Sequence, residues 1–303
     1  MSPPTAHKAF RLALIQMQVT ANKAANLAHA RSMVQAASRS GAQVVVLPEC
    51  FNSPYGTSYF QQYSEPELDA SSASATASAS SSVSPTVSAL STMARESKVY
   101  LIGGSFPEQG SSNNHLYNTC TVWDPLGARI LTHRKAHLFD IDVPGGICFK
   151  ESEVLTAGDS ISMVDTEYGR IGVGICYDMR FPEMAMVAAR RGCVAMVYPG
   201  AFNTTTGPLH WELLQRARAL DNQIYVAACS PARDLSASYV AWGHSSVVDP
   251  MGVVVATTDE SESIVYADVD PAVVSATRQA IPVYSQRRFD LYPDVADKAV
   301  GKE

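Results

Sequence analysis

AFRLALIQMQV (residues 9–19) and QVVVLP (43–48) enclose the segment that decides the fold class. Apolar residues alternate along 9–19 as in a strand, and 43–48 is a short apolar run typical of a strand covered on both faces. Residues 22–40 between them predict a helix that ends at Gly41. The apolar stripe of this helix contains Leu27, Ala30, Val34 and Ala37. A strand, a helix and a strand in this order predict an α/β fold.

The rest of the chain continues this alternation. Further strands are predicted at 99–106, 121–131, 169–175, 194–198, 223–229 and 246–256, and further helices begin at Pro85, near Pro182 and at His210. Residues 121–131 and 246–256 both have the form strand, Asp-Pro-x-Gly, strand, which predicts two hairpins with type I turns. The likeness of these hairpins suggests two related halves.

The chain is expected to form one unit, because no linker rich in Pro, Gly or charge separates the halves. We expect a single domain over 1–303, with two sheets inside, helices outside and a core at about 9–270. The tail at 283–303 is predicted to be extended and to lie across a neighbour. Residues 70–84 contain eight Ser and five Ala, cannot supply a packed face, and predict a mobile surface loop.

Composition excludes several classes of protein. With 303 residues, 46% of them hydrophobic, the chain can bury a large core, so a disordered protein is excluded. The net charge of −6 gives no electrostatic case for nucleic acid or an anionic membrane as a partner. Only 17% of residues are charged, against about 25% in typical domains, so we expect another subunit to cover part of the surface.

Cysteine usage and the first apolar segment indicate the compartment. Six cysteines without a CxxC pair favour reduced thiols over a disulfide framework or a zinc site. The apolar stretch 10–19 is interrupted by Arg11, Gln16 and Gln18, and no apolar run reaches the ~18 residues of a membrane span. We therefore expect a cytoplasmic protein. A fraction of it in mitochondria is the alternative that the sequence leaves open.

Three reactive side chains follow predicted strands: Glu49, Lys135 and Cys176. In open α/β sheets, active sites gather at the carboxyl ends of strands. Cys176 also precedes the helix near Pro182, whose free N–H groups favour a thiolate. A thiolate beside a carboxylate and an ammonium is a candidate nucleophile. Each residue alone also fits an ordinary role: Glu49 in a surface turn, Lys135 as a solvated charge and Cys176 as a small core residue. The pattern alone therefore does not show that the three side chains meet in the fold.

Several other side chains are expected to be structural. His133 and His137 have the i, i+4 spacing of a zinc helix, but HRKAH follows a strand pattern and has Lys where such motifs have Glu. Cys50 is expected to point away from Glu49 as a packed thiol. Core or near-core thiols are expected at Cys120, Cys148, Cys193 and Cys229. Arg216 and Arg218 are expected to form structural pairs.

Longer motifs resemble the nitrilase superfamily of carbon–nitrogen hydrolases. They are VVLPECFNSPYG (45–56), THRKAHLFDIDVPGGICFKESEVLTAG (132–158), VGICYDMRFPE (173–183), YPGAFNTTTGPLHWELLQRARALDNQIYVAACSPAR (198–233) and YVAWGHSSVVDPMG (239–252). The resemblance implies a four-layer α-β-β-α sandwich in a single domain, with no cofactor and no metal. It also implies a homodimer formed through helices near the active site. The Ser/Ala-rich stretch 70–84 departs from the family pattern.

The resemblance also implies site residues. Glu49, Lys135 and Cys176 correspond to the family's catalytic triad, in which the cysteine forms a thioester with the substrate and the glutamate transfers protons. Glu151 corresponds to a supporting glutamate and is expected to orient Lys135 or the substrate amide. Lys135 and the backbone N–H of Tyr177 are expected to stabilise the oxyanion. Pocket residues are expected at Tyr55, Tyr177, Phe202 and Thr205.

Within the superfamily, the motifs are similar to those of omega-amidases, which implies a dicarboxylic acid monoamide such as 2-oxoglutaramate or 2-oxosuccinamate as substrate. The free carboxylate of such a substrate calls for a cation or several donors. Candidates are Arg180, Arg233, Tyr55, Thr205 and Thr206, although Arg180 could equally pair with Asp178 or Glu183. A deaminated glutathione amidase of the same superfamily is the alternative. A nitrilase, an N-carbamoyl hydrolase and a catalytically silent dimeric scaffold are less favoured.

Overall fold

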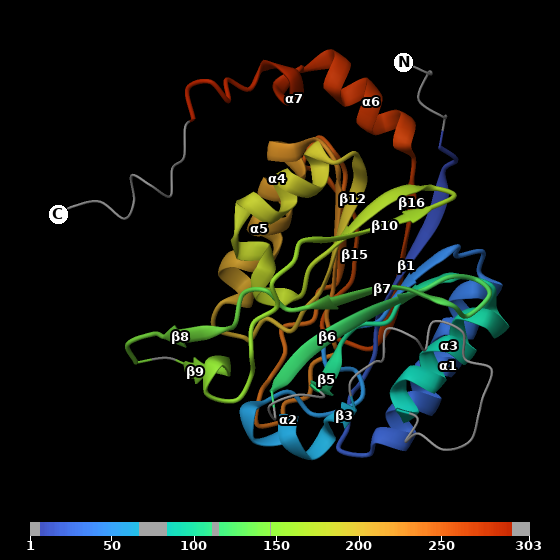
Figure 1. The fold of residues 1–303 in the computed structure, drawn as a ribbon, viewed down its shortest axis with the longest axis vertical. Helices are drawn as coiled ribbons and strands as arrows, with labels where there is room; N and C mark the ends of the chain where they lie inside the picture. Colours follow the sequence, from blue (N-terminus) through green and yellow to red (C-terminus); the bar gives the residue numbers. More distant parts are fainter. Residues whose placement is uncertain (1–6, 67–83, 111–114, 146, 293–303) are drawn as a thin grey trace.

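Two β-sheets packed face to face organise the structure, a computed structural model that describes residues 7–66, 84–110, 115–145 and 147–292 (Figure 1). The eight-stranded sheet has the order β16 (Ser263–Val269), β1 (Phe10–Gln16), β2 (Val44–Val46), β4 (Tyr100–Ile102), β6 (Leu116–Trp123), β5 (Phe106–Gln109) and β3 (Glu65–Pro66), with β7 (Arg129–Arg134) paired to β6. The six-stranded sheet has the order β10 (Ser162–Thr166), β11 (Gly169–Val173), β12 (Cys193–Pro199), β13 (Tyr225–Cys229), β14 (Ser246–Val248) and β15 (Val254–Thr257). A separate hairpin pairs β8 (Asp140–Asp142) with β9 (Cys148–Lys150).

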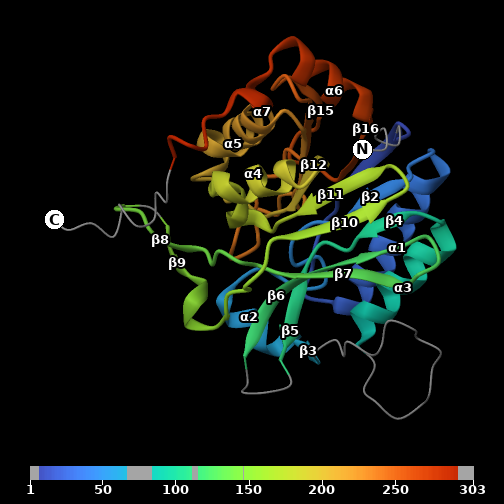
Figure 2. The same ribbon diagram turned by 45° about the horizontal axis from the view of Figure 1, so that its top comes forward.

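Helices cover the outer face of each sheet and complete four layers (Figure 2). On the eight-stranded sheet these are α1 (Lys23–Arg39) and α3 (Pro85–Ser97), and on the six-stranded sheet α4 (Pro182–Arg190) and α5 (Gly207–Asn222). The remaining helical elements are α2 (Thr57–Tyr63), α6 (Pro271–Ala280), α7 (Val283–Gln286) and the 3₁₀ turns η2 (Glu151–Glu153) and η3 (Cys176–Arg180). The expected α-β-β-α order is confirmed. Within the described ranges, no helix has the length and apolar content needed to cross a membrane.

Local sequence signals set the ends of the helices on the first sheet. The Asn22 side chain caps α1 by accepting a hydrogen bond from the backbone N–H of Ala25 at 3.0 Å. Ser84 caps α3 in the same way, and Pro85 fits the first turn, where its missing N–H costs nothing. Lys98 ends α3 in the left-handed region, with φ of 54°. These helices therefore begin where the sequence predicts.

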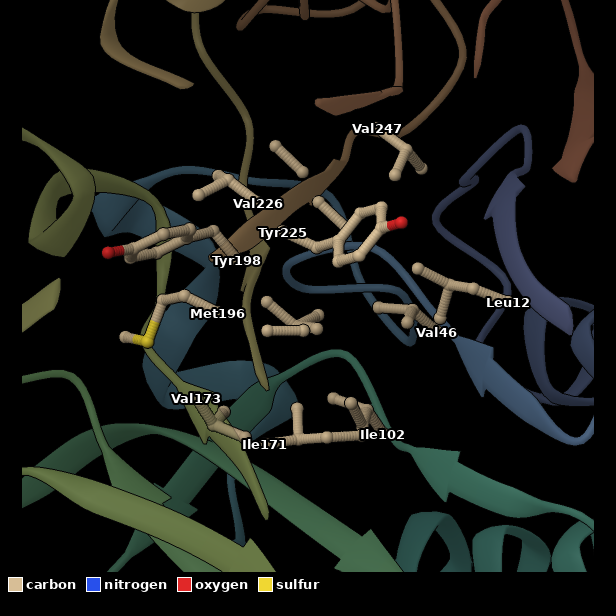
Figure 3. Packing of buried hydrophobic residues seen from close by; sticks show 14 of the residues in the cluster. Leu12, Val46, Ile102, Ile171, Val173, Met196, Tyr198, Tyr225, Val226 and Val247 are labelled. Carbon is tan, nitrogen blue, oxygen red and sulfur yellow. The ribbon is translucent and has the colours of Figure 1, made fainter. Parts of the chain in front are cut away.

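The main core lies between the two sheets (Figure 3). Leu12, Val46 and Ile102 of the eight-stranded sheet face the six-stranded sheet, where Ile171 and Tyr225 pack against them. A second apolar cluster fills the space beneath α1 and α3. Both faces of the eight-stranded sheet are thus buried, which explains the uninterrupted Val-Val-Val of β2.

Parallel strands bring two reactive loops to one place. β1, β2 and β4 are parallel, as are β11, β12 and β13, so the carboxyl ends of each set meet at one edge. The loop after β2 carries Glu49, and the loop after β11 carries Cys176. Gly104, with φ of 60°, lets the first loop pass closely, because a Cβ there would collide with the carbonyl oxygen of Pro48.

The remaining expectations have mixed outcomes. Both Asp-Pro-x-Gly hairpins are confirmed, as β6–β7 and β14–β15. The tail is not extended from its start, because residues 283–286 form α7, where the Tyr284 ring lies against the guanidinium groups of Arg190 and Arg278. Residues 293–303, and residues 70–83 of the Ser/Ala-rich stretch, lie outside the described residues.

Candidate active site

Glu49 lies in the turn after β2 and is almost completely buried. Its Oε1 accepts hydrogen bonds from Lys135 Nζ at 3.0 Å and from Asn118 Nδ2 at 2.9 Å. Its Oε2 has no hydrogen-bond partner among the described residues. Glu49 is thus held by one oxygen and keeps the other free to exchange a proton.

Glu151 holds the same lysine from another direction. Lys135 Nζ lies 3.0 Å from Glu151 Oε1 and 2.9 Å from Oε2, and both side chains are fully buried. The hydroxyl of Tyr55 also donates to Oε1 at 2.7 Å, and the backbone N–H of Phe139 donates to Oε2 at 2.7 Å. Both oxygens of Glu151 are therefore occupied. Glu151 is thus suited to hold the ammonium group in place and not to carry a proton.

Cys176 opens η3 directly after the loop that follows β11. Its φ of 46° is in the left-handed region, which is unusual for a residue other than glycine. The thiol accepts a hydrogen bond from the backbone N–H of Ala201, with 3.4 Å between N and Sγ. Space for this turn depends on Gly200, since a Cβ there would lie only 3.2 Å from Cys176 Cα. The position of the thiol is therefore fixed by a constrained backbone conformation.

The charges around Cys176 and Glu49 determine where the proton resides. Burial raises the pKa of the Cys176 thiol well above its ordinary value, and the charge of Glu49 raises it further. Burial also raises the pKa of Glu49, although the Lys135 ammonium opposes this shift. Burial alone would lower the pKa of Lys135, but the two glutamates hold it well above its usual range. Burial and the Glu49 charge therefore disfavour the thiolate that the sequence-based argument expects, and Cys176 lies on η3, six residues before α4 begins.

A cavity of about 290 Å³ opens onto Glu49. Its lining includes Tyr55, Ala201 and Tyr239, and also Tyr59, Asp234, Ser236 and Ser238. The volume is just below the ~300–1,000 Å³ typical of small-molecule sites. The cavity therefore fits a small substrate.

The four predicted pocket residues have different positions. Tyr55 lines the cavity, whereas the other three are not among its lining residues. Tyr177 packs edge-on against Phe139 and Phe181. Phe202 packs edge-on against Trp211. The backbone N–H of Thr205 donates to the Asn203 side chain.

The two candidate arginines also differ. Arg180 pairs with neither Asp178 nor Glu183; its Nη1 lies 3.1 Å from His210 Nδ1, and its guanidinium covers the ring of Phe202. Its Nε is buried without a partner in the described part of the chain, and burial lowers its pKa. Arg233 instead donates to the Trp242 carbonyl at 2.7 Å and lies 3.8 Å from Glu260. Arg180 is therefore the stronger candidate for binding an anion.

The residues expected to be structural mostly have such roles. His133 and His137 do not point at a metal position but converge on Asp178. Arg218 donates to the carbonyls of Met179 and Arg180, and Arg216 to that of Gly252. All six cysteines are free, and five are buried. Cys148 is exposed, so its expected core position is wrong: it lies on the β8–β9 hairpin, which projects away from both sheets (Figure 1).

Sequence reasoning missed three groups that touch the candidate site: Asn118, the N–H of Ala201 and Tyr239. Asn118 carried a signal, because it is an amide inside the otherwise apolar-rich strand LYNTCTVW. Tyr239 donates from its hydroxyl to the Ala201 carbonyl at 2.6 Å and contacts the Tyr55 ring. The role of the Ala201 N–H depends on backbone geometry, which no side-chain pattern reveals.

Comparison with known proteins assigns this arrangement to a family. The Carbon-nitrogen hydrolase family model matches residues 11–279. Hydrolase C26A3.11 of Schizosaccharomyces pombe is 56% identical over 292 residues, 96% of this chain and 86% of that protein. Omega-amidase NIT2 of Bos taurus is 55% identical over 290 residues, 96% of this chain and 99% of that protein. The crystal structure of Saccharomyces cerevisiae Nit3, described as a member of branch 10 of the nitrilase superfamily, has a TM-score of 0.84 and 45% identity over 95% of this chain and 100% of that one. The chain belongs to the carbon–nitrogen hydrolase family of the nitrilase superfamily.

Proposed function

We propose that the protein is an omega-amidase that hydrolyses the terminal amide of small dicarboxylic acid monoamides. The observation that carries this proposal is the free Oε2 of the buried Glu49 beside the protonated thiol of Cys176. A thiol with a raised pKa needs a base, and Glu49 has one oxygen available for that task. The similarity to omega-amidases over nearly the whole chain supports the same assignment.

Acylation begins when Glu49 takes the proton of Cys176. The sulfur then forms a bond to the amide carbon, and the carbonyl oxygen becomes an oxyanion. The Lys135 ammonium has three hydrogens, and two of them suffice for the glutamates, so the third serves the oxyanion together with the Tyr177 N–H. Breakage of the C–N bond, with proton transfer from Glu49 to nitrogen, releases ammonia and leaves a thioester.

Deacylation repeats these roles with water. Glu49 removes a proton from the water molecule, whose oxygen attacks the thioester carbon. The C–S bond then breaks, the sulfur regains its proton from Glu49, and the carboxylic acid leaves. Glu151 takes no proton in either step, because both its oxygens are occupied by Lys135, Tyr55 and Phe139.

Arg180 is the proposed partner of the substrate's free carboxylate. It is a half-buried cation whose Nε has no hydrogen-bond partner among the described residues, and burial lowers its pKa. It is not among the residues that line the cavity, and no acidic side chain is paired with it in the described part of the chain. A carboxylate from the substrate supplies the missing anion.

A homodimer is proposed on the basis of one exposed apolar surface. Leu209, Leu213 and Leu220 of α5 are more than half exposed and recur at helical spacing. The turn with Met251 and Val253 lies beside them, since Arg216 of α5 donates to the Gly252 carbonyl. Such a patch at the surface of a chain with few charged residues favours a second copy as its cover. The six free thiols agree with a reducing compartment such as the cytoplasm.

The test is ammonia release from purified protein with 2-oxoglutaramate, 2-oxosuccinamate and deaminated glutathione side by side. We expect turnover of the two small substrates and little of the larger one, because the cavity is small. Cys176→Ala is the control and should release nothing. Turnover of deaminated glutathione alone would refute the substrate class, and no turnover of any amide would refute the enzyme.

A further inference from the structure

Of the four proposed catalytic side chains, Cys176 comes from a different sheet from its partners. Glu49 and Lys135 follow β2 and β7 of the eight-stranded sheet, whereas Cys176 follows β11 of the six-stranded sheet. The distance between the thiol and its base therefore depends on how the two sheets are fixed to each other at this point.

One buried carboxylate connects the two sides. Asp178, two residues after Cys176, has no solvent exposure. Its Oδ2 accepts from the backbone N–H of Ile175 at 2.8 Å and lies 3.2 Å from His133 Nε2. Its Oδ1 accepts from the backbone N–H of His137 at 2.9 Å and lies 2.8 Å from His137 Nδ1.

These four contacts are made by sequence neighbours of Cys176 and of Lys135. Ile175 directly precedes Cys176, and His133 and His137 stand two residues on either side of Lys135. The other nitrogen of His133 lies 3.0 Å from Ser162 Oγ on β10, which adds a further link to the six-stranded sheet. Asp178 thereby joins the turn of the nucleophile to the segment of the lysine.

The protonation states agree with this role. Burial would raise the pKa of Asp178, but hydrogen bonds from His133 and His137 lower it well below its ordinary value. An ionised carboxylate only accepts hydrogen bonds, so His137 Nδ1 and His133 Nε2 both carry protons. Every hydrogen-bonding direction of Asp178 is then used within the protein, and none remains for substrate.

We propose that Asp178 is a positioning residue that holds the strained Cys176 turn against the Lys135 segment and so places the thiol beside Glu49. This proposal rests on the proposed function of Cys176 and Glu49. In this arrangement Asp178 counters the tendency of a non-glycine residue to leave the left-handed region at Cys176. An Asn at 178 would turn an NH₂ group toward one of the two backbone N–H donors and loosen the turn.

The test measures the rate at which iodoacetamide alkylates Cys176, followed by mass spectrometry of the peptide that contains it. Alkylation needs no amide substrate, so a wild-type protein that alkylates normally but releases no ammonia would refute only the proposed substrate. Asp165→Asn on β10, where the carboxylate is exposed and bound to Arg170, is the matched control and should alkylate at the wild-type rate.

We expect Asp178→Asn to lower the alkylation rate and kcat by up to ~10²-fold, the scale of a 1 Å misplacement of reacting groups. A double-mutant cycle with Glu49→Gln should be non-additive, because Asp178 acts through the placement of Cys176 beside Glu49. A rate within twofold of wild type, or full additivity in the cycle, would overturn the proposal.

A second pair of variants decides the matter if Asp178→Asn fails to fold. His137→Asn keeps a donor at the position of Nδ1, whereas His137→Leu removes it. The proposal predicts that His137→Asn alkylates about tenfold faster than His137→Leu, a ratio that reflects one cross-sheet hydrogen bond of ~1–2 kcal/mol. Equal rates in the two folded variants would contradict it.

Discussion

Glu49 and Glu151 bind the same ammonium group, but only Glu49 has an oxygen without a hydrogen-bond partner in the described structure. Because of this difference, the two buried glutamates have different proposed roles. Glu151 is fixed by Lys135, Tyr55 and Phe139, and stabilises the site. Glu49 retains one free oxygen, and is the proposed proton carrier.

The two glutamates should respond differently to the same substitution. Glu49→Gln keeps the oxygen that accepts from Lys135 and places its NH₂ group where no partner is lost. We expect it to lower kcat by ~10²–10⁴-fold, the usual contribution of a general base. It should lower the free energy of unfolding less than Glu151→Gln does, because only Glu151 also accepts from Tyr55 and from a backbone N–H.

Glu151→Gln turns an NH₂ group toward the Lys135 ammonium or the Phe139 N–H. Breaking a buried ion pair in this way typically costs ~3–5 kcal/mol. Urea unfolding and turnover of both variants would check this prediction. Equal losses of stability in the two variants would contradict the assignment of roles.

The pH profile of kcat/KM should report the raised pKa of Glu49. Burial and the Glu151 charge raise this pKa above its ordinary value near 4.5, so the base is lost as pH falls through a midpoint above 4.5. Removal of the Glu151 charge takes away one cause of the rise, so the acidic midpoint of Glu151→Gln should move to lower pH. A profile whose acidic limb does not move would show that Glu49 is not the titrating group.

Arg180 should determine the affinity for the substrate carboxylate. Arg180→Gln is expected to raise KM for 2-oxoglutaramate by ~10–10²-fold, since a hydrogen bond to a charged group is worth ~1.5–3 kcal/mol. Turnover of butyramide, which has no carboxylate, should change little. Arg233→Gln is the matched control, because Arg233 is engaged by Trp242 and Glu260. If Arg233→Gln instead raises KM selectively for the charged substrate, the assignment is wrong.

The apolar stripe of α5 should be required for the dimer. Leu213→Asp places a charge in the middle of the exposed Leu209–Leu220 surface and should convert a dimer to a monomer in sedimentation velocity. Leu126→Asp, at the exposed tip of the β6–β7 turn, is the control and should leave the assembly unchanged. If Leu213→Asp is still a dimer, the interface does not include this surface of α5.

The fold was largely predictable because its signals are local. The apolar run of β2, the Asn22 cap of α1 and the repeated Asp-Pro-x-Gly turns each act over a few residues, and all of them appear in the structure. Cys148 shows the limit of this reasoning. Its neighbours Ile147 and Phe149 are apolar like those of a core strand, but on β9 only Phe149 packs against the protein, and Cys148 is on the exposed side.

The candidate site was predictable only as residue types at strand ends. The free oxygen of Glu49 depends on Asn118 and Lys135, which are 69 and 86 residues away in sequence. The raised pKa of Cys176 depends on burial and on Glu49, which a local pattern of residues does not show. The sequence offers Asp178 as a partner of Arg180, but in the fold His133 and His137 are its partners.

A covalent intermediate on Cys176 is the feature of the proposed reaction that can be measured most directly. Wild-type protein would be quenched in acid during turnover of 2-oxoglutaramate, and the peptide containing Cys176 would be analysed by mass spectrometry. We expect an acyl group on the Cys176 sulfur that disappears when substrate is exhausted and never forms in Cys176→Ala. Ammonia release at the wild-type rate in Cys176→Ala, or turnover with an acyl group on another residue, would contradict it.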